Sequence, residues 1–251
     1  MTPELAAAAA ARPVGELETA WSTDPRTLRR AREVEVSGWA FYVAGRAGVL
    51  GDDVDPDTVA AAVGTIAPDA LRDGWQAAQR VGPSTIAAAR LDECARWGDE
   101  RLAEVADVRL VELLARVVNG ADATAMPVFA ATRTMVAAAG ESSRDGAGAQ
   151  AALLVHALSE LRTAALLVAC RATGLRPIEA LIAGPEGEQE AVTLGWSRPF
   201  PSRLAVLRRY TYAGALADKI TGGAFAALDA SERTELVDRL TAASSAVAVG
   251  G

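Results

Sequence analysis

The segment Gln150–Thr173, QAALLVHALSELRTAALLVACRAT, decides the fold class of this chain. Most of its residues are alanine, leucine or valine, and neither proline nor glycine occurs before Gly174. A run of this length and composition favours a helix over a strand. The sequence therefore predicts one long, nearly wholly apolar helix that Gly174 ends. Polar residues interrupt the apolar residues here and elsewhere, so we expect no membrane-spanning helix.

The whole chain shares this helical bias. Its 251 residues are 51% hydrophobic and only 5% aromatic, and Lys219 is the single lysine among many arginines. Alanine and arginine favour helices, whereas the strand-forming tyrosine and phenylalanine are scarce. The composition predicts an all-α fold with a sizeable core and excludes wholesale disorder. The formal net charge of −7 argues against nucleic acid as the main partner.

The chain also resembles itself, which indicates an internal duplication. The segment VAGRA at Val43–Ala47 recurs as VACRA at Val168–Ala172. Further anchors recur in the same order and with the same separation of 19 residues, namely Pro56 with Trp75 and Pro177 with Trp196. Chance similarity in an alanine-rich chain is the alternative, but alanine content does not generate matched proline and tryptophan positions.

Two tandem repeats are therefore expected, residues 1–120 and residues 121–251, each a helix-turn-helix-like unit of about 120 residues. We expect the two repeats to pack around a pseudo-twofold axis. The cleft between them is then the natural place for a small ligand.

Proline, aspartate and glycine mark the helix boundaries within these repeats. An apolar stripe runs through Val36–Leu50, and Asp55-Pro56 then supplies a cap and a first-turn proline for the next helix. Pro177–Ala183 is the corresponding short helix of the second repeat. A helix, a tight turn and a short second helix are the outline of a helix-turn-helix. The polar, glycine-rich segment Gly140–Gly148 is expected to be a loop.

Several motifs resemble an actinobacterial group of SalK-like proteins usually described as helix-turn-helix proteins. The resemblance covers most of the chain from about Val36 onward. The motifs that carry it are FYVAGRAG at Phe41–Gly48, PVFAATR at Pro127–Arg133, His156-Ala157 followed by Leu161-Arg162, and the stretch Asp218–Arg233. Some members carry basic, histidine-rich residues after the Leu-Arg pair, where this chain has Thr163–Ala165. The resemblance implies the helical fold and implies no particular reaction.

His156 is the only histidine of the chain, so any imidazole chemistry must use it. Glu160 follows four residues later and therefore lies on the same face of the predicted helix. A carboxylate in this position can orient an imidazole as a general acid or base. These two residues are the candidate catalytic pair. The alternative is a core histidine that a local hydrogen bond satisfies.

Three arginines in otherwise apolar segments are the candidate ligand-binding residues, because the guanidinium group suits carboxylates, phosphates and carbonyls. They are Arg46, Arg133 and Arg162, and Arg171 is the counterpart of Arg46 in the second repeat. The alternative is that each arginine pairs with an acidic side chain or ties helix ends together.

Aromatic residues close to these arginines are expected to line the pocket, namely Trp39, Tyr42 and Phe129. With Cys94 and Cys170 unpaired in sequence and only one histidine, no metal site and no cofactor are expected. The acidic tract Glu186–Glu190 is expected to be a solvated loop.

The favoured hypothesis is a cytoplasmic small-molecule-binding protein, or a cofactor-independent enzyme, of actinobacterial specialised metabolism. Its pocket would lie between the repeats, with arginines on an anionic or carbonyl group and His156 as the general acid or base. A transcriptional regulator is the first alternative. DNA is an unfavoured partner, because Asp57–Ala67 and Ile178–Ala183 contain no basic side chain. A structural protein that forms a homodimer without a ligand is the second alternative.

Overall fold

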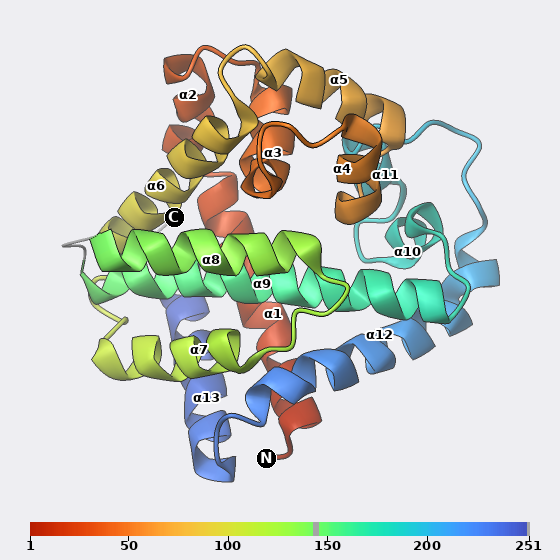
Figure 1. Ribbon diagram of the computed structural model, residues 1–251. Helices are drawn as coiled ribbons and strands as arrows, with labels where there is room; N and C mark the ends of the chain where they lie inside the picture. The colour runs from red at the N-terminus through yellow and green to blue at the C-terminus, as the bar shows by residue number, and fades with distance from the viewer. Residues whose placement is uncertain (143–145, 250–251) are drawn as a thin grey trace.

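The computed structural model describes residues 1–142 and 146–249, and their regular structure is helical throughout, with no strand in these two ranges (Figure 1). The all-α class predicted from the composition is confirmed. The helices of the first half are α1 (Pro3–Ser22), α2 (Pro25–Glu33), α3 (Gly38–Ala47), η1 (Gly48–Leu50, a 3-10 turn), α4 (Pro56–Val63), α5 (Pro68–Ala78), α6 (Pro83–Arg101) and α7 (Val108–Gly120). Those of the second half are α8 (Pro127–Ser142), α9 (Ala147–Ala172), α10 (Pro177–Ala183), α11 (Glu188–Thr193), α12 (Arg203–Phe225) and α13 (Ala230–Val249).

Proline and capping side chains set most helix starts, as the sequence predicts. Asp55 precedes the proline of α4 and accepts hydrogen bonds from the backbone N–H groups of Asp57 and Thr58. Asp229 accepts from the N–H of Glu232, whose side chain accepts from the N–H of Asp229, so that the pair forms a capping box at α13. These contacts satisfy backbone donors that lack helical partners.

The helix expected through Val36–Leu50 is shorter than its apolar stripe. Ser37 accepts a hydrogen bond from the N–H of Ala40 and so starts α3 at Gly38. The α-helix ends at Ala47, and Gly48–Leu50 continues as a 3-10 turn. A capping side chain therefore outweighs the apolar pattern in fixing the boundary.

Helix α9 is the centre of the molecule. Its most extensive contacts are with α1, α6, α7, α8 and α12, and Figure 1 shows α8 alongside it. By length and composition, α9 alone among the described helices is apolar enough to cross a membrane. Burial on so many sides accounts for that composition as the core helix of a bundle. The loop expected at Gly140–Gly148 is too long: Gly140–Ser142 belong to α8 and Ala147–Gly148 to α9, and residues 143–145 of it lie outside the described residues.

A second, smaller core joins the short helices α4 and α5 of the first half to the short helix α10 of the second half. Val59, Val63 and Leu71 of α4 and α5 pack in the same cluster as Ile178 and Ile182 of α10. Two hydrogen bonds also connect the segment between α4 and α5 with the segment that follows α11. The N–H of Ala67 donates to the carbonyl of Leu194, and the indole of Trp196 donates to the carbonyl of Thr65. The short helices α4 and α5 thus bury their apolar faces against α10 and the segment that follows it.

The predicted boundary between the repeats falls at the end of α7. Short helices with a first-turn proline, α4 and α10, follow α3 and α9 in the two halves. The duplication itself stays a prediction. Contacts across the boundary are extensive, because α6 packs against α9 and α1 packs against α12 and α13.

Candidate ligand-binding site

Arg46 and Glu160 form a buried ion pair between α3 and α9. The guanidinium donates from Nε to Oε1 at 2.8 Å and from Nη2 to Oε2 at 3.1 Å. Its third donor, Nη1, is 3.0 Å from the hydroxyl of Thr65. Burial by itself would lower the pKa of Arg46, but the carboxylate of Glu160 outweighs it and the pKa lies above its ordinary value. Glu160 therefore has a partner other than His156.

His156 pairs instead with Glu18 of α1. Its Nδ1 lies 3.0 Å from Oε2 of Glu18, and the indole Nε1 of Trp21 donates to the same oxygen at 2.9 Å. The rings of Trp21 and His156 meet edge to face, 5.3 Å apart. Burial by itself would raise the pKa of Glu18, but His156, Arg90 and Trp21 outweigh it and hold the pKa below its ordinary value.

Arg90 of α6 completes this polar cluster, which consists of Glu18, Trp21, Arg46, Arg90, His156 and Glu160. Its guanidinium carbon lies 4.4 Å from the ring centre of Trp21, and Nη2 lies 4.0 Å from Oε1 of Glu18. Its Nε is buried without a hydrogen-bond partner. A Cβ at Gly45 would lie 2.4 Å from Cδ of Arg90, so glycine is required for Arg90 to pass α3.

The polar cluster joins α1, α3, α6 and α9 in the interior. His156 is only 3% exposed and lines none of the described pockets. Each charge in the cluster faces an opposite charge or an aromatic ring, which is the usual condition for burying ionised groups. This arrangement suits the positioning of four helices.

The other candidate residues lie in three places, and only the first borders the polar cluster, where the ring centre of Tyr42 lies 5.9 Å from the guanidinium carbon of Arg90. Trp39 and Tyr42 stack with ring centres 5.7 Å apart, and the indole of Trp39 donates to the carbonyl of Ala70. Arg133 lies over Phe129 at 5.2 Å and donates to the carbonyl of Ala121 at the end of α7. Arg133 therefore caps the C-terminus of α7. The structure does not bring Arg133 or Phe129 to the polar cluster.

Arg162 lies beside a pocket. Its Nη1 donates to the carbonyl of Ala7 at 2.6 Å, and Nη2 lies 3.3 Å from Oδ1 of Asp218. Burial lowers the pKa of Arg162, although Asp218 opposes the shift. Arg162 and Asp218 line a side pocket of about 350 Å³. That side pocket shares Thr163 and Tyr210 with a larger neighbour.

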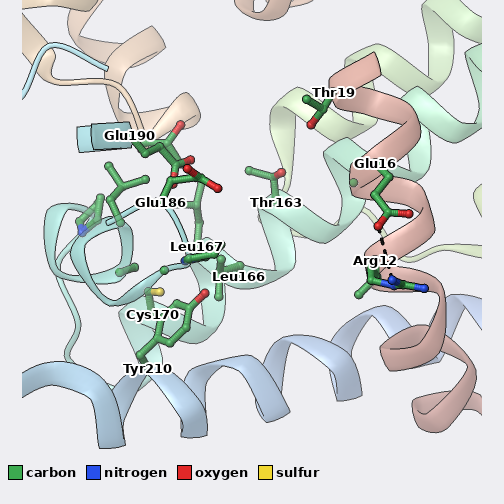
Figure 2. A pocket seen from close by; sticks show the side chains of 18 of the residues that line it. Arg12, Glu16, Thr19, Thr163, Leu166, Leu167, Cys170, Glu186, Glu190 and Tyr210 are labelled. Carbon is green, nitrogen blue, oxygen red and sulfur yellow. Dashed lines mark ion pairs between the residues drawn. The ribbon is translucent and has the colours of Figure 1, made fainter. Parts of the chain in front are cut away.

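The larger cavity, called here the Tyr210 pocket, has a volume of about 750 Å³ and lies between α1 and the segment α9–α12. Figure 2 shows Thr19 of α1 facing Glu186 and Glu190, with Thr163 of α9 between them and Tyr210 below. Leucines and alanines form its apolar wall, including Leu166, Leu167, Ala180 and Leu181. Thr65 also lines the pocket and so links it to Arg46 of the polar cluster.

Acidic side chains dominate the charge of the Tyr210 pocket. Arg12 pairs with Glu16 at 3.7 Å, which leaves Glu186 and Glu190 without an ion pair within the described residues. Burial, together with the charge of Glu186, raises the pKa of Glu190. Burial and Glu190 also raise the pKa of Tyr210. The arrangement favours a positive group between the two glutamates.

The described part of the chain offers few side chains for metal binding or for nucleophilic catalysis. No group of three or more histidine, cysteine, aspartate or glutamate side chains there could hold a metal ion. Cys170 lines the Tyr210 pocket, but burial raises the pKa of its thiol to about 11, so the reactive thiolate is scarce at neutral pH.

Some site residues escape sequence reasoning. Glu18 and Arg90 lie far from His156 along the chain, and only the packing of α1 and α6 against α9 brings them together. Glu186 and Glu190 look like part of a solvated tract, yet Glu190 is half-buried at the pocket wall. The clustering of acidic residues with no basic residue at helical spacing was the one available signal.

The fold and the pocket together define an all-helical protein with a cleft beside its central helix. The model of a helix-turn-helix family matches residues 7–251. The chain therefore belongs to this helix-turn-helix family. No curated protein and no solved structure matches the chain significantly.

Proposed function

We propose that the protein binds a small, mainly apolar molecule with a protonated amine in the Tyr210 pocket. One observation carries the proposal: Glu186 and Glu190, two carboxylates without an ion pair in the described residues, lie at one side of a largely apolar cavity of about 750 Å³. That volume is within the range of small-molecule sites, and a few polar groups in an apolar pocket are their usual composition.

The threonines of the pocket can orient a bound ligand through their hydroxyl groups. Thr19 lines the pocket from α1 and Thr163 lines it from α9, between Thr19 and the glutamates, where their hydroxyls are available to a polar group of the ligand (Figure 2). Thr65 already accepts a hydrogen bond from Arg46, so a ligand that contacts Thr65 would touch the polar cluster through it.

The expected anionic or carbonyl-bearing ligand has weaker support. Arg46 is paired with Glu160, Arg133 donates to backbone carbonyls, and Arg162 is shared between Ala7 and Asp218. An anion would have to displace these acceptors. His156 is buried away from the pockets, so binding is better supported than acid–base catalysis.

Isothermal titration calorimetry with phenylbutylamine and phenylbutanol tests the amine proposal. The two probes share an apolar body, and only the amine is charged at neutral pH. We expect the amine to bind about tenfold more tightly, and Glu190→Gln to remove most of that difference by weakening a partly desolvated charge pair. Equal affinity for both probes would contradict the proposal.

Glu188→Gln is the matched control, because Glu188 lies on the same short helix but is exposed and pairs with Arg198. This variant should bind the amine as the unaltered protein does. The pH dependence gives a second check. Affinity for the amine should fall as the pH drops through the raised pKa of Glu190, since the protonated carboxyl loses its charge.

Transcriptional regulation is the second candidate function, and membership of a helix-turn-helix family favours it. In the first half of the chain, α5 is the second of the two short helices. Its Asp69 and Asp73 are exposed, and its Arg72 pairs with Asp57 and Asp69. Acidic side chains at this position repel DNA phosphates. Tight, strongly salt-dependent retardation of duplex DNA would favour the regulator over the binding protein.

A further inference from the structure

A second cavity lies beside the C-terminal half of α9, called here the Arg171 pocket. Its volume is about 840 Å³, and α4, the start of α8 and α9 surround it. The wall is almost wholly apolar and includes Ala62, Met126, Val128, Val168 and Leu175. Such a wall suits a hydrocarbon or aromatic body.

Arg171 is the single charged side chain among the residues that line this pocket. It is exposed and forms no ion pair or side-chain hydrogen bond within the described residues. The arginines of the core are different, because Arg46 and Arg162 both have carboxylate partners. Arg171 is therefore available to an anion from outside.

The contrast with Arg46 strengthens this argument. Arg46 and Arg171 occupy equivalent positions in the recurring segments VAGRA and VACRA. Arg46 turns into the interior and is neutralised by Glu160, whereas Arg171 borders a cavity with no carboxylate in its lining. If structural packing alone explained both residues, Arg171 would be expected to have an acidic partner as well.

We infer that the Arg171 pocket binds an apolar carboxylic acid, with the hydrocarbon or aromatic body against α4 and α8 and the carboxylate on Arg171. A guanidinium offers two parallel donors to a carboxylate, which fixes the orientation of the acid. A cationic ligand is disfavoured here, because the only charge in the lining is positive. The inference does not depend on the amine proposed for the Tyr210 pocket.

The two pockets are neighbouring cavities with three lining residues in common. Leu167, Cys170 and Pro177 belong to the lining of both. Leu167 packs closely on Gly64, where a Cβ would lie 2.8 Å from its Cδ2. A carboxylic acid and an amine should therefore bind at the same time, each with its own stoichiometry of one.

Calorimetry with phenylbutyrate, phenylbutanol and phenylbutylamine tests the inference. We expect phenylbutyrate to bind the unaltered protein, and Arg171→Gln to weaken this binding about three- to tenfold while the affinity for phenylbutylamine stays unchanged. Arg208→Gln is the matched control, because Arg208 is an exposed arginine that lines no described pocket. It should leave the affinity for phenylbutyrate unaltered.

A second variant tests the place of binding without changing any charge. Ala61 lines the Arg171 pocket and is exposed on α4, so Ala61→Phe should fill the cavity and abolish phenylbutyrate binding. Ala88→Phe, at an exposed alanine of α6, controls for surface aromaticity. Circular dichroism confirms that each variant is folded.

Three outcomes would overturn the inference: no phenylbutyrate binding, equal binding by Arg171→Gln, or competition between phenylbutyrate and phenylbutylamine for one site. The last outcome would place the acid in the Tyr210 pocket. Failure of phenylbutylamine to bind would contradict only the proposed function. The two hypotheses are thus separable with the same set of probes.

Discussion

At the scale of single residues, variants of the ion pair between Arg46 and Glu160 give the strongest test of what stabilises the fold. Their side chains are 11% and 8% exposed. Arg46→Met leaves Glu160 buried without its partner and should lower the free energy of unfolding by about 3 kcal/mol. Urea denaturation followed by circular dichroism measures this change.

The double variant of Arg46→Met with Glu160→Met supplies the control. Two methionines of similar length replace both charges, so neither ion remains buried and unpaired. We expect the double variant to recover most of the lost stability. A double variant as unstable as Arg46→Met would contradict this account of the pair.

Glu18 should make the free energy of unfolding depend on pH. Its pKa is below the ordinary value of 4.5 in the folded protein, because His156, Arg90 and Trp21 outweigh its burial. A carboxyl with a depressed folded pKa stabilises the fold above its unfolded pKa and loses that contribution as the pH falls through the folded pKa. The unaltered protein should therefore lose the contribution of Glu18 to its stability as the pH falls below about 4.5.

Glu18→Gln should flatten this acid limb, measured as the free energy of unfolding in urea across the acidic range. Glu104→Gln is the comparison, because Glu104 is exposed and forms no ion pair in the described residues. If both variants follow the unaltered protein below pH 4.5, Glu18 does not contribute to the acid dependence.

His156 and Glu160 were visible in the sequence because one is the only histidine and both lie on one helical face. Their partners were not visible. Helical spacing suggests a pair between His156 and Glu160, whereas tertiary packing gives each of them a partner from another helix, Glu18 and Arg46. Contacts between elements distant in sequence cannot be read from local spacing.

At the scale of elements, α6 and α9 pack closely together at Gly98 and Gly148. A Cβ at Gly98 would lie 2.4 Å from the carbonyl oxygen of Gly148 and 2.6 Å from Cβ of Ala152. Gly98→Ala must therefore push the helices apart and should cost about 1–3 kcal/mol of unfolding free energy. Thermal and urea denaturation of the variant measure the loss.

Gly214→Ala is the matched control, because no atom lies within 4 Å of a Cβ at this helical glycine of α12. Alanine is the better helix former, so this variant should gain about 0.5–1 kcal/mol. A loss of stability at Gly214 equal to that at Gly98 would show that the glycines matter for a reason other than close packing.

Local chemistry made most elements predictable. The first-turn prolines and the aspartate cap give α4 and α10 at the residues expected, because a helix start depends on a few neighbouring residues. The break after Ala47 was not expected, since the apolar stripe continues through it. Boundaries within a continuous apolar pattern depend on packing, which periodicity does not report.

At the scale of the whole molecule, we expect one cooperative unfolding transition. Helix α1 packs against α9, α12 and α13, and α6 packs against α9, so both predicted repeats share their largest core. Urea transitions followed by circular dichroism and by tryptophan fluorescence should coincide. Two separated transitions, one for each half, would contradict the shared core.

The sequence by itself determined the helical class, the central apolar helix and most helix starts, because these depend on composition and on neighbours within a few residues. Only the tertiary structure decided which charges are neutralised and which face a cavity. Arg46 and Arg171 occupy equivalent positions in recurring segments, yet one is buried against Glu160 and the other borders a pocket. The physical reason is that desolvation and pairing depend on the helices packed around a residue, and such packing joins segments far apart in the chain.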